Sequence, residues 1–128
     1  IRIGARMSLV NTGSGHIFLA YASLEERNLM LEEREDAGTV QVPDGFEYRL
    51  ATVRNRGYEV MKSLQVSGVT NLSVPILGPL SSAVATLTCP FISRLDQPEA
   101  PNKNDVLELL IAVGRKISNG PLMALASG

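Results

Sequence analysis

An α+β domain, with helices packed against one antiparallel sheet, is the fold class that this sequence predicts. Two observations support the prediction. The stretch from Val69 to Cys89 contains two β-branched runs joined by turn residues at 78–82, which is the pattern of a β-hairpin. The rest of the chain contains several segments with the caps and the apolar spacing of helices. Helices mixed with short strands, with a hairpin as the main sheet element, are typical of α+β domains.

Size and charge narrow the class of protein further. The chain has 128 residues, which suits one domain with a real core, and no apolar run approaches the roughly 20 residues of a membrane-spanning helix. Its 12 basic and 13 acidic residues give a net charge of -1, which argues against a nucleic-acid surface within this chain. A single cysteine and a single histidine exclude an internal disulfide and a Cys/His metal cluster, and favour a reducing, cytoplasmic compartment. We therefore expect one domain that uses no metal or cofactor and does not contact a membrane.

The first helix is expected directly after a glycine-rich turn. Thr12 or Ser14 can cap a short helix that contains the apolar run 17–21. The first amides of a helix lack partners and lie at the positive end of its dipole, so the turn at Gly13, Ser14 and Gly15 is a candidate site for a carboxylate. A helix-capping turn without a ligand explains the same residues equally well.

Two further helices are expected in the first half of the chain. Ser23 and Glu26 form a capping box at the start of the second helix. Asp44 can cap the third helix, and Gly57 can end it. The spacing of apolar residues places the buried face of the third helix at Phe46, Leu50 and Val53. The arginines of this helix are expected to be solvated; they are Arg49, Arg54 and Arg56.

Strands are expected at 58–61 and on both sides of the turn at 78–82. Both strands of the hairpin have the apolar density of largely buried strands. Their alternation places Leu72, Val74 and Ile76 on one apolar face. Asn71 and Ser73 lie on the opposite face, where they can either bind a small ligand or face water.

A last helix is expected after the hairpin, with Asn102 or Asn104 as its cap. An apolar stripe along it is formed by Val106, Leu110, Val113 and Ile117. The stripe predicts that this helix packs on the apolar face of the sheet. Gly114 costs about 1 kcal/mol relative to alanine in a helix, unless a neighbour requires a close approach there.

The order and spacing of several short motifs resemble the effector-binding domain of IclR-type transcriptional regulators. The motifs are the residues Thr12 to Ala20, Leu50 to Tyr58, Gly68, Leu72 to Leu77 and Ile92 to Arg94. The resemblance implies a GAF-like fold, a central antiparallel sheet with helices packed around it, and an effector pocket between the sheet and the loop and helix layer. It also implies a homo-oligomer, a dimer or a tetramer. The N-terminal winged helix-turn-helix of the family has no counterpart in residues 1–128, which would form one effector-binding domain that lacks its first part.

The family's effector contacts can be transferred to this sequence by position. The pair that contacts the effector carboxylate in glyoxylate- and pyruvate-responsive relatives falls on Gly13 and Ser14. The other contact positions fall on or near Met61, Val69, Asn71, Leu87 and Cys89. Four of these positions depart from the family pattern. An aspartate is replaced by methionine and two serines by apolar groups, so the pocket should be less polar than that of a small keto-acid sensor. Together with Gly15 and Ser73, these residues are the candidate effector site.

The function predicted is that of a bacterial sensor domain that binds a small organic acid with an apolar or aromatic body and controls a fused DNA-binding domain. DNA would be contacted only through that domain. One alternative is an oligomerisation scaffold without a ligand. Another is a small enzyme, but no catalytic residue is predicted, because the only candidates are His16 and Cys89, far apart in sequence and without a third group to orient them. His16 is expected on the solvent side of its helix.

Overall fold

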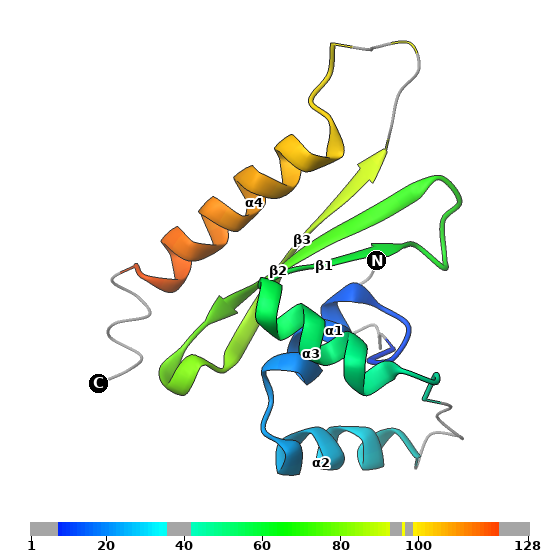
Figure 1. The fold of residues 1–128 in the computed structure, drawn as a ribbon, viewed down its shortest axis with the longest axis vertical. Coiled ribbons are helices and arrows are strands. Elements are labelled where there is room, and N and C mark those ends of the chain that lie inside the picture. The colour runs from blue at the N-terminus through cyan, green and yellow to red at the C-terminus, as the bar shows by residue number, and fades with distance from the viewer. Residues whose placement is uncertain (1–7, 36–41, 93–95, 97–98, 121–128) are drawn as a thin grey trace.

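The structure is a computed structural model, and it describes residues 8–35, 42–92, 96 and 99–120 (Figure 1). Within these residues there are four α-helices and an antiparallel sheet with the strand order β1-β2-β3, and α1 and α4 pack on the sheet. The helices are α1 (Gly13–Tyr21), α2 (Leu24–Glu35), α3 (Phe46–Arg56) and α4 (Lys103–Ser118). The strands are β1 (Glu59–Lys62), β2 (Val69–Leu77) and β3 (Ala83–Ile92), and a 3-10 turn, η1 (Pro79–Ser81), joins β2 to β3. The α+β class and the central antiparallel sheet are confirmed.

The predicted hairpin is present, and its apolar face is as expected. β2 pairs with β3 from Val69 opposite Ile92 to Leu77 opposite Ala83, and Leu72, Val74 and Ile76 are buried. The expectation that both strands are largely buried is wrong for β3, whose residues are half-buried or exposed. β3 has a neighbouring strand on one side only within the described residues, and α4 packs mainly on β2, so less of β3 is covered.

The third helix has the predicted buried face but a different cap. Gly45, in the left-handed conformation with φ 77°, precedes α3, and no side chain caps the helix. Asp44 lies one residue too early to act as the cap, because the chain enters this helix through a conformation that glycine adopts most easily. Gly57, with φ 86°, ends the helix as predicted.

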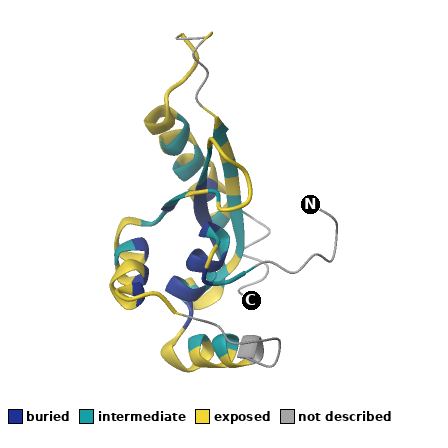
Figure 2. Ribbon diagram, turned by 90° about the vertical axis from the view of Figure 1, so that its right-hand side faces the viewer, coloured by how far each residue is buried: buried dark blue, intermediate teal, exposed yellow. Residues whose placement is uncertain are grey.

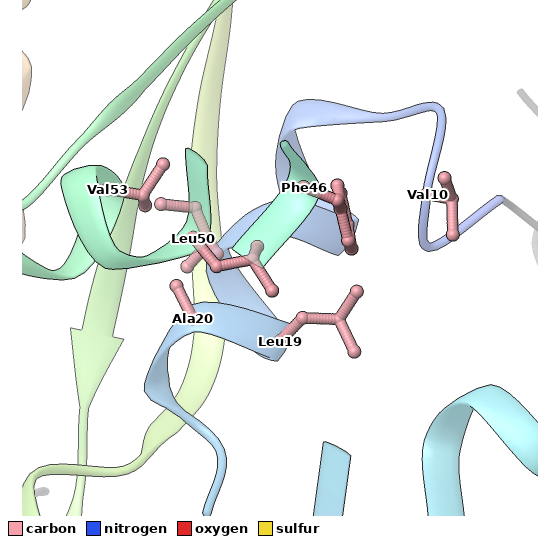
Figure 3. Packing of buried hydrophobic residues seen from close by; sticks show 7 residues of the cluster. Val10, Leu19, Ala20, Phe46, Leu50 and Val53 are labelled. Carbon is pink, nitrogen blue, oxygen red and sulfur yellow. The ribbon is translucent and has the colours of Figure 1, made fainter. Parts of the chain in front are cut away.

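The core between α1 and α3 fixes the position of the first helix. Its buried residues are Val10, Ile17, Leu19, Ala20, Phe46, Leu50 and Val53, most of them labelled in Figure 3. Full burial of a side chain such as Leu19 or Leu50 contributes about 1.5–3 kcal/mol. Figure 2 shows the buried residues gathered in α1, the inner side of α3 and the middle of the sheet. The apolar half of α1 is therefore held against α3, and its first turn is left to contact the sheet.

The last helix packs on the sheet as predicted, but the predicted stripe is covered only in part, with Val106 and Leu110 half-buried. Val113 and Ile117 of the expected stripe are 39% and 42% exposed. α4 instead turns Gly114 and Ser118 toward β2. A Cβ on Gly114 would lie only 2.9 Å from Val74 Cγ2, and Ser118 Oγ accepts a hydrogen bond of 2.9 Å from Leu77 N. Small residues are needed where α4 approaches the strand this closely. This explains why the apolar stripe identified the packed face only in part and why residue 114 is glycine.

The remaining helix ends agree with the sequence. Ser23 Oγ accepts from Glu26 N at 3.1 Å at the start of α2, and Asn102 caps α4 by accepting from Asp105 N at 2.9 Å. Within the described ranges, no helix combines the length and the hydropathy that crossing a membrane would require.

Candidate functional site

The first turn of α1 is docked on the polar face of the hairpin. Thr12 is the cap, and its Oγ1 accepts a hydrogen bond of 3.0 Å from Gly15 N. The Thr88 hydroxyl on β3 is 3.0 Å from Ser14 Oγ and 2.9 Å from Ser73 Oγ, so it joins the helix to both strands. A Cβ on Gly13 would lie 3.1 Å from Ser73 Oγ. Glycine at this position therefore allows the helix start to lie directly on the sheet.

Gly15 makes a second close approach, on the other side of the turn. A Cβ there would lie 2.2 Å from Leu9 O and 2.5 Å from Leu9 Cα, distances that real side chains do not show. The segment before α1 is thus pressed against the helix backbone. Gly15 serves the packing of the turn, whatever the turn binds.

A buried carboxylate lies beneath the helix start. Glu59, the first residue of β1, is fully buried, and its Oε2 accepts from His16 Nδ1 at 2.7 Å and from Arg49 Nε at 2.9 Å. Its Oε1 accepts from Arg56 Nη2 at 2.8 Å and from Val60 N at 2.9 Å. Burial alone would raise the pKa of the Glu59 carboxyl, but the hydrogen bonds from His16 and Arg49, the charge of Arg49 and the Val60 amide lower this pKa to about 2.

His16 is enclosed by this cluster, so the expectation that it faces solvent is wrong. Its side chain is buried, with Nε2 2.6 Å from Val10 O and the ring edge-on to Phe46 at 5.2 Å. A carbonyl oxygen and an ionised carboxylate only accept hydrogen bonds, so each ring nitrogen of His16 faces an acceptor. The cluster of Glu59, His16, Arg49 and Arg56 has one acidic and two guanidinium groups and is therefore net positive. We call it the Glu59 cluster.

The arginines of α3 were expected to be solvated, and all three are exposed, but each of them also binds a partner within the protein. Arg49 and Arg56 hold Glu59, and Arg54 Nη1 donates to Ala20 O at 3.2 Å while its guanidinium lies over the Tyr21 ring. The sequence did contain a signal. Residues two apart in a strand point to the same face, so Glu59 shares the face of Met61, which the family resemblance placed in the pocket. An acidic side chain on such an inward face requires a cationic partner.

The structure brings most of the nine predicted effector residues to one face of the sheet. Gly13, Ser14 and Ser73 meet at the helix start. Val69 and Asn71 share the face of Ser73 by alternation along β2, and Met61 shares it because it pairs directly with Asn71.

Leu87 and Cys89 lie on the opposite face. They pair with Val74 and Leu72, and Val74 faces α4. The residue between them, Thr88, is the one that points to α1.

A cleft lies elsewhere, at the C-terminal ends of α3 and α4 beside the end of β2, and none of the nine predicted residues lines it. Its volume is about 470 Å³, and it is lined by the guanidinium-bearing residues Arg54, Arg56 and Arg115. We call it the basic cleft. This cleft was not predictable from the sequence, because its lining residues come from five elements spread along the chain, namely α1, α3, β2, η1 and α4.

Residues 1–119 match the sequence model of the family described as "Bacterial transcriptional regulator IclR C-terminal". The chain belongs to this family. The resemblance seen in the motifs is therefore confirmed, and so is the GAF-like fold that it implies. This IclR-family domain is a regulatory domain and not an enzyme.

Several solved structures share the fold. The C-terminal domain of E. coli KdgR is 22% identical and has a TM-score of 0.69 over 98% of this chain and 75% of that chain. Pseudomonas aeruginosa HmgR is 27% identical, with a TM-score of 0.68 over 92% of this chain and 46% of its own. An IclR homologue from Microbacterium hydrocarbonoxydans, complexed with 4-hydroxybenzoate, is 26% identical, with a TM-score of 0.63 over 91% of this chain and 48% of that one. This chain thus spans about half to three quarters of these three chains. A comparison with curated proteins gives no match.

Proposed function

We propose that this domain senses a small organic acid with an apolar or aromatic body in the bacterial cytoplasm, and that binding controls a winged helix-turn-helix joined to it. The observation that supports the ligand class is the docking of the α1 start on the polar face of the hairpin, above the net positive Glu59 cluster. A positive helix end and a positive cluster both favour an anion at this place.

The proposed contacts follow from the exposure of the residues on this face. Gly15 N is already bonded to Thr12, which leaves the amides of Gly13 and Ser14 as donors to a carboxylate. Ser14, Met61, Val69 and Asn71 are partly exposed, so they can touch a ligand. Ser73 is fully buried and bonded to Thr88, and it positions the helix start. Leu87 and Cys89 face α4 and have no place in the proposed contact set.

The comparison with solved structures supports an acid of this kind. The Microbacterium homologue was solved with 4-hydroxybenzoate, which combines a carboxylate with an aromatic ring. In this domain Met61 and Val69 would lie against such a ring, and Asn71 would bond a polar substituent on it.

The first test uses small acids, 4-hydroxybenzoate among them, each paired with its primary alcohol. An acid at one hundred times its Kd should raise the free energy of unfolding by about 2.7 kcal/mol, and the alcohol should have little effect. Thermal unfolding measures both. Asn71→Leu should reduce the shift for hydroxylated acids, whereas Thr70→Val, on the opposite face of β2, should leave it unchanged. Equal stabilisation by an acid and its alcohol would contradict the proposal.

We also propose that the domain forms a dimer or a tetramer through the outer face of α4. Leu109, Val113 and Ile117 recur there every four residues, and Leu109 is 66% exposed. Sedimentation at high micromolar concentration should show self-association that Val113→Glu weakens. Asn104→Glu adds the same charge on another face of the helix and should have no such effect. A monomer at every concentration would exclude this interface.

DNA binding is proposed to belong to the winged helix-turn-helix outside this sequence. The charge of the chain is balanced, with 12 basic and 13 acidic residues. In a gel mobility-shift assay at about 0.15 M salt, the chain alone should therefore not bind duplex DNA. Specific binding would contradict the proposal that DNA is contacted only through the other domain.

A further inference from the structure

The basic cleft opens where β1 stops short of the end of β2. The last residue of β2 that pairs with β1 is Ser73, and the cleft lies beside the residues that follow it. Its apolar floor consists of Val74, Pro75, Leu77 and Ile111. Its polar walls contain Tyr21, Asn55, Ser81, Ser118 and Asn119 together with the three arginines. The volume of about 470 Å³ lies within the range of small-molecule sites.

The charge of the basic cleft is unbalanced. No aspartate or glutamate occurs among the described residues that line it. Arg56 is bonded to Glu59, but Arg54 and Arg115 take part in none of the ion pairs found in the described part of the chain. The C-terminal ends of α3 and α4 each contribute roughly half a negative charge, which offsets about one of the three guanidinium groups. The cleft therefore remains positive.

We propose that the basic cleft binds a small anionic molecule through its phosphate or carboxylate group, at a site separate from the proposed effector site. The planar guanidinium group matches the geometry of both oxyanions and forms paired hydrogen bonds with them. The hydroxyl and amide groups of the walls add hydrogen-bond partners, and the apolar floor accommodates the body of the molecule. The nine residues predicted for the effector lie outside this cleft, so the proposal does not depend on them.

The experiment is calorimetric titration of the chain with phenyl phosphate, with benzoate and with benzyl alcohol as the uncharged match. At least one of the two anions should bind with a Kd below 1 mM, and benzyl alcohol should not bind. Arg115→Gln should weaken binding of that anion at least tenfold. Arg115 is exposed and in no described ion pair, so this variant should remain folded, as circular dichroism would verify. Tighter binding of phenyl phosphate would assign the site to phosphates, and tighter binding of benzoate would assign it to carboxylates.

A control variant separates the basic cleft from the general charge of α4. Lys116→Gln removes the neighbouring charge on α4, outside the lining of the basic cleft, and should change the Kd by less than twofold. Failure of both anions to bind, or an equal loss in Lys116→Gln, would overturn the proposal. Benzoate also has the chemistry of the proposed effector, so binding that Arg115→Gln leaves unchanged would belong to the effector site. That result would overturn the present proposal and leave the effector proposal intact.

Discussion

Glu59→Gln is expected to lower the free energy of unfolding by about 3–5 kcal/mol. The substitution leaves His16, Arg49 and Arg56 around a neutral amide, and removing one member of a buried ionic cluster costs about this much. Urea unfolding at pH 7 measures the change. Glu47→Gln is the control, because Glu47 is 71% exposed and pairs only with Arg27, so its loss should cost less than about 1 kcal/mol. Similar costs for the two variants would contradict the description of the Glu59 cluster.

The difference in the free energy of unfolding between the wild type and Glu59→Gln should also depend on pH. The pKa of Glu59 is lowered from 4.5 to about 2 in the folded protein, so its stabilising contribution is complete above pH 4.5 and is lost as pH falls toward 2. The stability difference between the wild type and Glu59→Gln should therefore shrink over this range. A difference that stays constant down to pH 2 would show that folding does not lower the pKa of the Glu59 carboxyl.

Gly15→Ala is the second substitution with a large expected effect, a loss of about 3 kcal/mol. The new methyl group would lie 2.2 Å from Leu9 O, and backbone cannot move aside as a flexible side chain can. Gly13→Ala is the matched control in the same helical turn. Its nearest contact is the Ser73 hydroxyl at 3.1 Å, which can shift slightly, and alanine favours the helix by up to about 1 kcal/mol. In denaturant unfolding, Gly15→Ala should have a much lower free energy of unfolding than Gly13→Ala. The reverse order would contradict the packing described.

Local patterns were sufficient to predict most of the secondary structure. The spacing of Phe46, Leu50 and Val53 identified the buried face of α3, and the alternation in β2 identified the face that α4 covers. The face of α4 was predicted in this way only in part, since Val106 and Leu110 are half-buried but Val113 and Ile117 are exposed. Periodicity finds the most apolar face of a helix, whereas contact with a strand at short distance selects small residues such as Gly114.

The sequence predicted which segments meet at the candidate site, but it was less accurate about which residues of those segments take part. The helix start and the polar face of β2 were predicted to meet, and they do. On β3 the transferred positions were Leu87 and Cys89, while Thr88 is the residue that faces α1. An offset of one residue reverses the face of a strand, so an approximate alignment cannot assign strand residues to a site. The Glu59 cluster was missed because its members are brought together from α1, α3 and β1.

The Glu59 cluster also determines which pairing of β1 with β2 is possible. β1 has only four residues, Glu59 to Lys62, so its ladder alone discriminates weakly between neighbouring registers. A slip by one residue would turn Glu59 to the α4 face of the sheet and leave His16 buried without its acceptor. Stranding charged groups in this way costs several kcal/mol for each ion. Alternative alignments of this short strand are thus penalised by side chains from two helices, α1 and α3.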